Sequence, residues 1–85
     1  MLEPSPLKNK RFRLTLNGKT IDFGSKNGQT YIDHGDAVKR ANYLKRHHAN
    51  EDWKSFNPGS ASAWILWGPS TNIETNLKLY LNLFS

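Results

Sequence analysis

The chain has 85 residues, a formal net charge of +5 and no cysteine. These values exclude disulfides and thiolate metal sites, and they predict one domain with a modest core. No apolar run is long enough to cross a bilayer and the N-terminus lacks an apolar signal core, so we expect a soluble, non-secreted protein.

The charge is unevenly distributed along the chain. Residues 1–50 carry ten Lys or Arg against four acids, whereas residues 51–85 carry two against three. The first part of the chain therefore favours a partner of negative charge, such as nucleic acid, an acidic protein surface or an anionic membrane.

The N-terminal segment, residues 1–10, contains Pro4 and Pro6 and few apolar side chains. Because proline favours extended backbone in the residue before it, we expect an extended N-terminal arm here. Residues 11–85 are expected to form a single small α+β domain, in which a hairpin packs against about three helices.

The clearest local pattern lies in residues 11–24, where Asn17-Gly18 separates two alternating runs. Asn-Gly favours a two-residue type I′ turn, because both central positions need positive φ. Such a turn places Arg13 opposite Asp22 and leaves one apolar and one polar face. We therefore predict a β-hairpin, with residues 29–32 as a candidate third strand.

A first helix is predicted over residues 36–48, with Asp33 or Asp36 as its N-cap. Its apolar stripe is thin, and its cations add to those of the hairpin. The candidate basic binding surface comprises Arg11, Arg13, Lys19, Lys39, Arg40, Lys45 and Arg46. Cations near the end of a helix also stabilise its dipole, so part of this surface has a structural explanation as well.

A short second helix is predicted to begin at Ser60 and to end before Gly68-Pro69. Trp64 and Trp67 cannot both face the core together with Ile65. We place Trp64 in the core against the hairpin, which leaves Trp67 exposed to a partner.

The last helix shows a capping box, with Thr71 as N-cap and Glu74 reaching back to it. An apolar stripe follows at helical spacing, and two further leucines fall outside it. Such a surplus indicates an enclosed position or a protein contact. The candidate apolar docking surface comprises Trp67, Leu79 and Leu83.

Catalytic and metal-binding patterns are not found in the sequence. His47 and His48 are adjacent, so on a helix they point about 100° apart, and no pair that includes His34 has a zinc-ligand spacing. No two acids share an apolar context that would separate their pKa values, and no serine stands in a nucleophile motif. We expect no enzymatic activity, no metal and no cofactor.

Several segments between residues 10 and 70 resemble a known group of proteins. The most specific of these segments are Ile32-Asp33-His34 and Ile65-Leu66-Trp67. The group is a small family of uncharacterised proteins from nucleocytoplasmic large DNA viruses. It has no established activity, so the resemblance implies a viral context and no particular site residue.

Two hypotheses about function follow. The first is a non-enzymatic structural component of a large DNA virus particle, a minor capsid or other virion protein that docks onto other viral structural proteins. It would be found in the virion, and in the host cytoplasm or virus factory during assembly. The alternative is a small basic module that contacts DNA or RNA phosphates without sequence specificity. Salt distinguishes them, because phosphate binding weakens steeply as salt rises.

Overall fold

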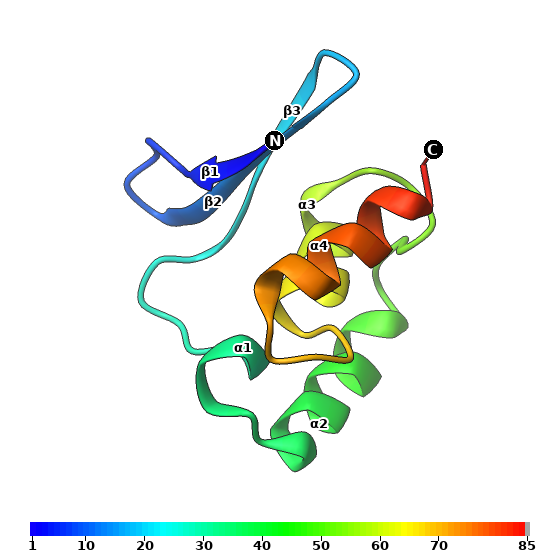
Figure 1. Ribbon diagram of the computed structural model, residues 1–85. Coiled ribbons are helices and arrows are strands. Elements are labelled where there is room, and N and C mark those ends of the chain that lie inside the picture. Colours follow the sequence, from blue (N-terminus) through cyan, green and yellow to red (C-terminus); the bar gives the residue numbers. More distant parts are fainter. Residues whose placement is uncertain (85) are drawn as a thin grey trace.

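The structure, a computed structural model, describes residues 1–84 and shows a three-stranded antiparallel sheet followed by helices (Figure 1). In chain order the elements are β1 (Leu2–Pro4), β2 (Lys10–Leu16), β3 (Lys19–Ser25), α1 (Tyr31–His34), α2 (Ala37–His48), α3 (Pro58–Ala61), the π-helical turn η1 (Ser62–Leu66) and α4 (Ile73–Asn82). The predicted α+β class is confirmed. Within the described residues, no helix has the length and apolar character that a membrane span needs.

The β2–β3 hairpin forms in the predicted register. The turn residues Asn17 and Gly18 have φ values of 52° and 80°, as a type I′ turn requires. Arg13 lies opposite Asp22, and its Nε donates a hydrogen bond of 2.9 Å to the carboxylate. On the other face of the hairpin Leu14 is completely buried. The Asn-Gly turn and the alternation of apolar and polar side chains therefore specify the same pairing of the strands.

The third strand of the sheet is not the predicted one. β1, from the expected N-terminal arm, pairs antiparallel with β2 in the order β1-β2-β3. Residues 31–34, which overlap the candidate strand, form the short helix α1 instead. The reason is local: the backbone N–H and the hydroxyl of Thr30 both donate to the Asp33 carboxylate, which starts a helical turn. Asp33 therefore belongs to α1, and Asp36 is the N-cap of α2.

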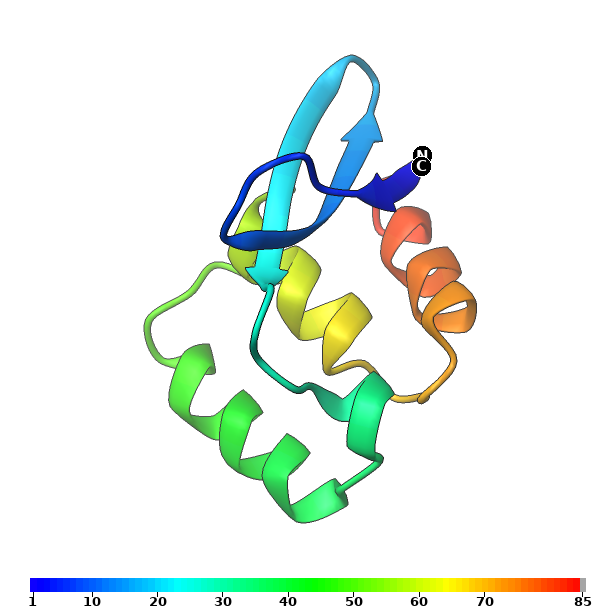
Figure 2. The same ribbon diagram turned by 90° about the vertical axis from the view of Figure 1, so that its left-hand side faces the viewer.

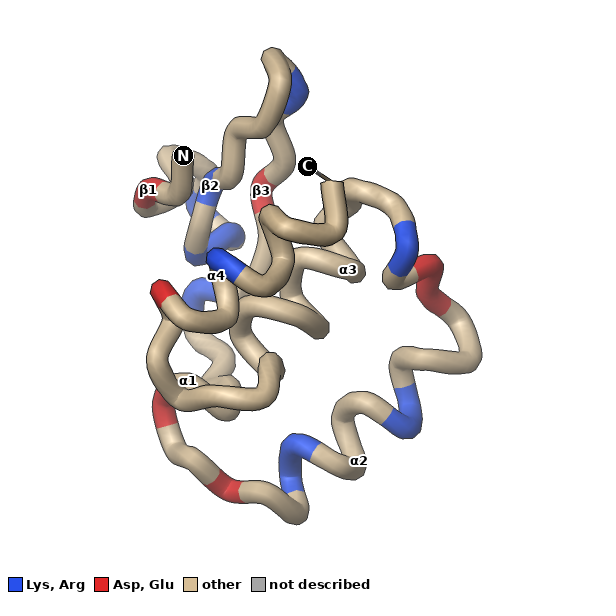
Figure 3. Tube along the Cα trace, turned by 45° about the vertical axis from the view of Figure 1, so that its right-hand side comes forward, with Lys and Arg blue, Asp and Glu red and all other residues tan. Residues whose placement is uncertain are grey.

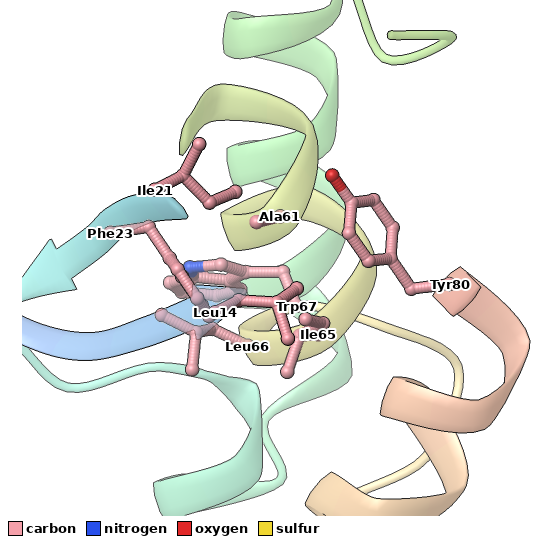
Figure 4. Packing of buried hydrophobic residues seen from close by; sticks show 8 residues of the cluster. All are labelled: Leu14, Ile21, Phe23, Ala61, Ile65, Leu66, Trp67 and Tyr80. Atoms are coloured by element: carbon pink, nitrogen blue, oxygen red, sulfur yellow. The ribbon is translucent and has the colours of Figure 1, made fainter. Parts of the chain in front are cut away.

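The core lies around α3 and η1, which run through the middle of the molecule with α2 on one side and α4 on the other (Figure 2). Phe23 points into it from the sheet, Ile65 from η1 and Tyr80 from α4, and all three are completely buried (Figure 4). The Tyr80 hydroxyl shares a hydrogen bond of 2.6 Å with Ser60. Gly24, with a φ of 81°, leaves room for Leu66, because a Cβ there would lie 2.8 Å from its Cδ1.

Two helices begin at other residues than predicted. Asn57, rather than Ser60, caps α3, and Pro58 occupies its first position. Asn72, rather than Thr71, caps α4 and accepts hydrogen bonds from two backbone N–H groups of the first turn. Asparagine is preferred over threonine as an N-cap, which explains the second difference.

Of the two tryptophans near η1, Trp67 is the more deeply buried, and Trp64 packs against the core while it stays partly exposed. Trp67 is only 9% exposed and belongs to the core, whereas Trp64 is half-buried. The Trp67 N–H bonds to the Ser62 carbonyl at 3.1 Å, five residues back, as in a π-helix. The wider turn shifts the following side chain around the helix axis toward α2. The prediction that Trp67 is exposed for docking is therefore wrong.

Candidate nucleic-acid interface

The two arginines of β2 are engaged within the fold. Arg11 donates two hydrogen bonds of 2.7 Å to the Asp33 carboxylate, and Arg13 binds Asp22 through Nε and Nη2. The hydrogen bonds from Arg11 are the main reason that the pKa of Asp33 lies far below its ordinary value. Those from Arg13 lower the pKa of Asp22 in the same way. The hairpin part of the predicted basic surface is thus largely neutralised.

Two further cations of that surface hold the fold together. The Lys19 ammonium donates to the Phe56 carbonyl at 3.3 Å. Arg40 reaches from α2 to the end of η1, where its Nε lies 3.0 Å from the Trp67 carbonyl and 2.9 Å from the Gly68 carbonyl. Carbonyls at the end of a helix carry partial negative charge, so the Arg40 guanidinium stabilises this junction.

The remaining three cations, Lys39, Lys45 and Arg46, are exposed. Their side chains make no hydrogen bond or ion pair with another residue of the described part of the chain. Figure 3 shows the Lys and Arg positions of α2 as two blue stretches. With Asn42 and Trp67 the three exposed cations line an open groove with a volume of about 690 Å³, which we call the basic groove. The structure therefore brings together the α2 part of the predicted surface and separates it from the hairpin.

The floor of the basic groove is part of an aromatic stack. Tyr43 lies parallel to Trp67, with ring centroids 4.3 Å apart and planes 5° apart, and His47 stacks on Tyr43 at 4.1 Å. Tyr43 and His47 meet because residues four apart lie one above the other on a helix. Burial raises the pKa of Tyr43 to about 12, so its hydroxyl stays neutral at physiological pH. The cations therefore stand beside a stack of three rings, of which Tyr43 is the central one.

A second hollow, of about 330 Å³, adjoins this stack between α2 and the segment that leaves β3. Its polar wall includes Lys10, Ser25, Gln29 and Thr30, and its opposite wall includes Tyr43 and Trp67. We call it the polar hollow. Figure 2 shows the segment after β3 passing η1 on its way to α1, with α2 alongside.

The histidines do not form a metal site in the described part of the chain, where no group of three or more His, Cys, Asp or Glu side chains has suitable geometry. The Nδ1 of His34 accepts the Asp36 N–H at 2.9 Å, which places the proton on Nε2, and this buried atom has no hydrogen-bond partner. His47 pairs instead with Glu51 at 3.3 Å.

The predicted apolar docking surface is reduced to Leu79 of α4 and its C-cap residue Leu83. Leu79 and Leu83 are 41% and 49% exposed, whereas Trp67 is buried against Tyr43. The remaining apolar stripe of α4 packs onto the core, as its helical spacing indicates.

Sequence reasoning missed the aromatic stack and the polar hollow. The spacing of Tyr43 and His47, four residues apart on the inner side of α2, was the available signal for the stack. The segment after β3 reads as an ordinary surface turn, and no local pattern indicates that Ser25 and Gln29 lie beside a tryptophan from residue 67.

The structure thus defines a small α+β domain in which a basic groove and a polar hollow share an aromatic wall. The chain belongs to a family of unknown function (DUF5754), whose sequence profile matches residues 1–47. The matched part includes the whole sheet, α1 and α2 as far as His47, and therefore all three unpaired cations of the groove. No curated protein and no solved structure matches the chain.

Proposed function

We propose that this protein is a small, non-enzymatic module that binds nucleic acid through phosphate contacts in the basic groove. The observation that supports the proposal is the set of three exposed cations without an intramolecular partner, which line one groove on one helix. The cations that serve the fold are engaged elsewhere, so these three remain available to an external anion. The amide of Asn42, in the same groove, adds a neutral donor and acceptor.

The proposal predicts a specific salt dependence. Neutralising three phosphates releases the counterions condensed on them, so log affinity falls linearly with log salt concentration. Three contacts give a slope of about −2.7 for duplex DNA and about −2.1 for a single strand. Such a slope predicts much tighter binding in dilute buffer than at physiological salt.

The test is fluorescence anisotropy with labelled duplex and single-stranded oligonucleotides over a salt series. The groove variant replaces Lys39, Lys45 and Arg46 together by Gln. The matched control replaces Lys8, Lys54 and Lys78 by Gln, which removes the same charge from exposed positions outside the groove. We expect the groove variant to lose most of the affinity and of the slope, while the control keeps both. Equal losses in the two variants would show diffuse attraction by net charge and would refute the groove as the site.

A second candidate function rests on the exposed leucines Leu79 and Leu83, at the C-terminal end of α4, and on the sequence resemblance to proteins of large DNA viruses. We propose it as the alternative: a minor capsid or other virion protein that docks onto other viral structural proteins through Leu79 and Leu83. Docking of this kind is apolar and should change little with salt. Replacing Leu83 by Glu should then abolish incorporation into purified particles. Incorporation at the wild-type level would exclude this contact.

A further inference from the structure

We infer that the basic groove and the polar hollow form one continuous path for single-stranded nucleic acid, with Trp67 at the junction. This inference rests on the proposed function and specifies its substrate class. A phosphate-binding groove alone accepts a duplex or a single strand. The adjoining hollow, however, has a chemistry that suits bases without a pairing partner.

Continuity of the path follows from the residues that the two depressions share. Trp67 lines both of them, and Tyr43, stacked on it at 4.3 Å, lines the hollow. At the far side of the hollow stands Lys10, an exposed cation at the start of β2. Cations therefore stand along the path from the basic groove to the far side of the hollow, as tracking of a phosphate backbone requires.

The wall of the hollow offers hydrogen bonds that the fold does not use. The Gln29 amide and the Ser25 hydroxyl make no side-chain hydrogen bond with any residue between 1 and 84. An amide and a hydroxyl can each donate and accept, so they can satisfy the edge of any base. Bases in a duplex have these edges occupied by their partners, whereas bases in a single strand present them to a protein.

Aromatic rings also border the path. Proteins that bind single strands without sequence preference combine a positive groove with aromatic side chains on which bases stack. Here one face of Tyr43 stacks on Trp67 and the other on His47, so a base would meet the edges of these rings rather than an open face. The preference for a single strand therefore rests on the polar hollow.

The test compares a labelled oligothymidine 12-mer with a labelled DNA hairpin duplex at low, constant salt. The hollow variant replaces Ser25 and Gln29 by Leu, which removes the unused polar groups at unchanged charge. Its control places leucines at Asn50 and Thr75, two exposed polar positions away from the hollow. Loss of one hydrogen bond to a base should weaken binding of the 12-mer about fivefold. Affinity for the duplex should stay within about twofold, and the control should match wild type with both probes.

A second variant, Lys10→Gln, gives an independent readout. Removing one phosphate contact should reduce the salt slope for the 12-mer by about 0.7 and leave the slope for the duplex unchanged. If the wild-type protein binds duplex and 12-mer equally, and both variants behave like wild type, the path is refuted while the phosphate groove stands. If the wild-type protein binds neither probe in dilute buffer, the proposed function itself is refuted.

Discussion

The buried amide of Asn76 offers the sharpest test of how the fold positions the aromatic stack. Asn76 is completely buried in α4, where its Nδ2 donates to the Ile65 carbonyl at 2.9 Å and to the Ser70 carbonyl at 2.6 Å. Its Oδ1 accepts the Ser70 N–H at 3.1 Å. One side chain thus joins α4 to η1 and to the turn that follows Trp67.

Replacing Asn76 by Ala removes these three hydrogen bonds. Each contributes about 1 kcal/mol net, so we expect a loss of about 3 kcal/mol in the free energy of unfolding. Domains of this size unfold with a free energy of about 4–13 kcal/mol, and each kcal/mol shifts Tm by about 4–8 °C. The variant should therefore melt about 12–24 °C below wild type, as followed by circular dichroism at pH 7.

The isosteric variant Asn76→Asp separates hydrogen bonding from packing. At pH 7 its carboxylate would face two carbonyl oxygens, so its loss of stability should equal or exceed that of the Ala variant. Protonation restores a donor, and the difference from wild type should shrink as the pH falls. Asn42→Ala is the control, because Asn42 is exposed in the middle of α2. A loss below about 1 kcal/mol in Asn76→Ala would show that this network does not hold η1 and α4 together.

Three further predictions concern stability. A methyl group at buried Gly68 would meet the Trp64 carbonyl oxygen and lie 2.7 Å from Cγ of Asn76. Gly68→Ala should therefore lower the free energy of unfolding by about 1–3 kcal/mol, as is typical of an overpacked core, and the same melting assay measures this loss. The side chains of the Arg11–Asp33 ion pair are about a quarter exposed, so solvent should screen their attraction. A double-mutant cycle with Arg11→Gln and Asp33→Asn should give a coupling energy below about 1 kcal/mol. A larger coupling energy would contradict this screening. The folded-state pKa values of Asp22, Asp33, Asp36 and Asp52 are lowered, so the folded protein binds fewer protons than the unfolded chain and stability should fall as the pH drops below 3.8, the ordinary aspartate pKa. Burial raises the pKa of Tyr43 to about 12, so this hydroxyl ionises at lower pH in the unfolded chain than in the folded protein, and stability should also fall as the pH rises above 10. The measurement is a series of urea-unfolding curves over pH 2–12. Stability that does not decline at either end of this range would contradict these assignments.

The parts of the fold that the sequence predicts are those determined by local chemistry. Asn17-Gly18 fixes the hairpin register, and Asp36 marks the start of α2, because each depends on neighbouring residues alone. The sequence does not predict the strand β1, since three residues that include Pro4 carry no strand pattern. They are held by contacts with distant residues, namely the pairing with β2 and the packing of Leu2 against the core.

Long-range contacts also explain why the sequence predicts the candidate site only in part. Charge alone makes Lys39 and Arg40 equivalent, yet one lines an open groove and the other binds carbonyls of the residues that follow η1. The position of Trp67 depends on a π-helical turn, for which the sequence shows no local signal. The sequence predicts a basic surface of seven cations. Only the three-dimensional structure shows which of them bind groups within the fold and which three line the basic groove.

The order of strands in the sheet also bears on how the chain reaches this structure. Each strand pairs with its neighbour in sequence, so the loops closed by pairing are short and their entropic cost is small. A hairpin with a favourable turn closes in about 1–10 μs. The core, in contrast, joins Leu14 and Phe23 to η1 and Tyr80 across long stretches of chain. We therefore expect docking of the helices onto a nascent sheet to limit the folding rate, and the groove beside Trp67 to be completed only in that last step.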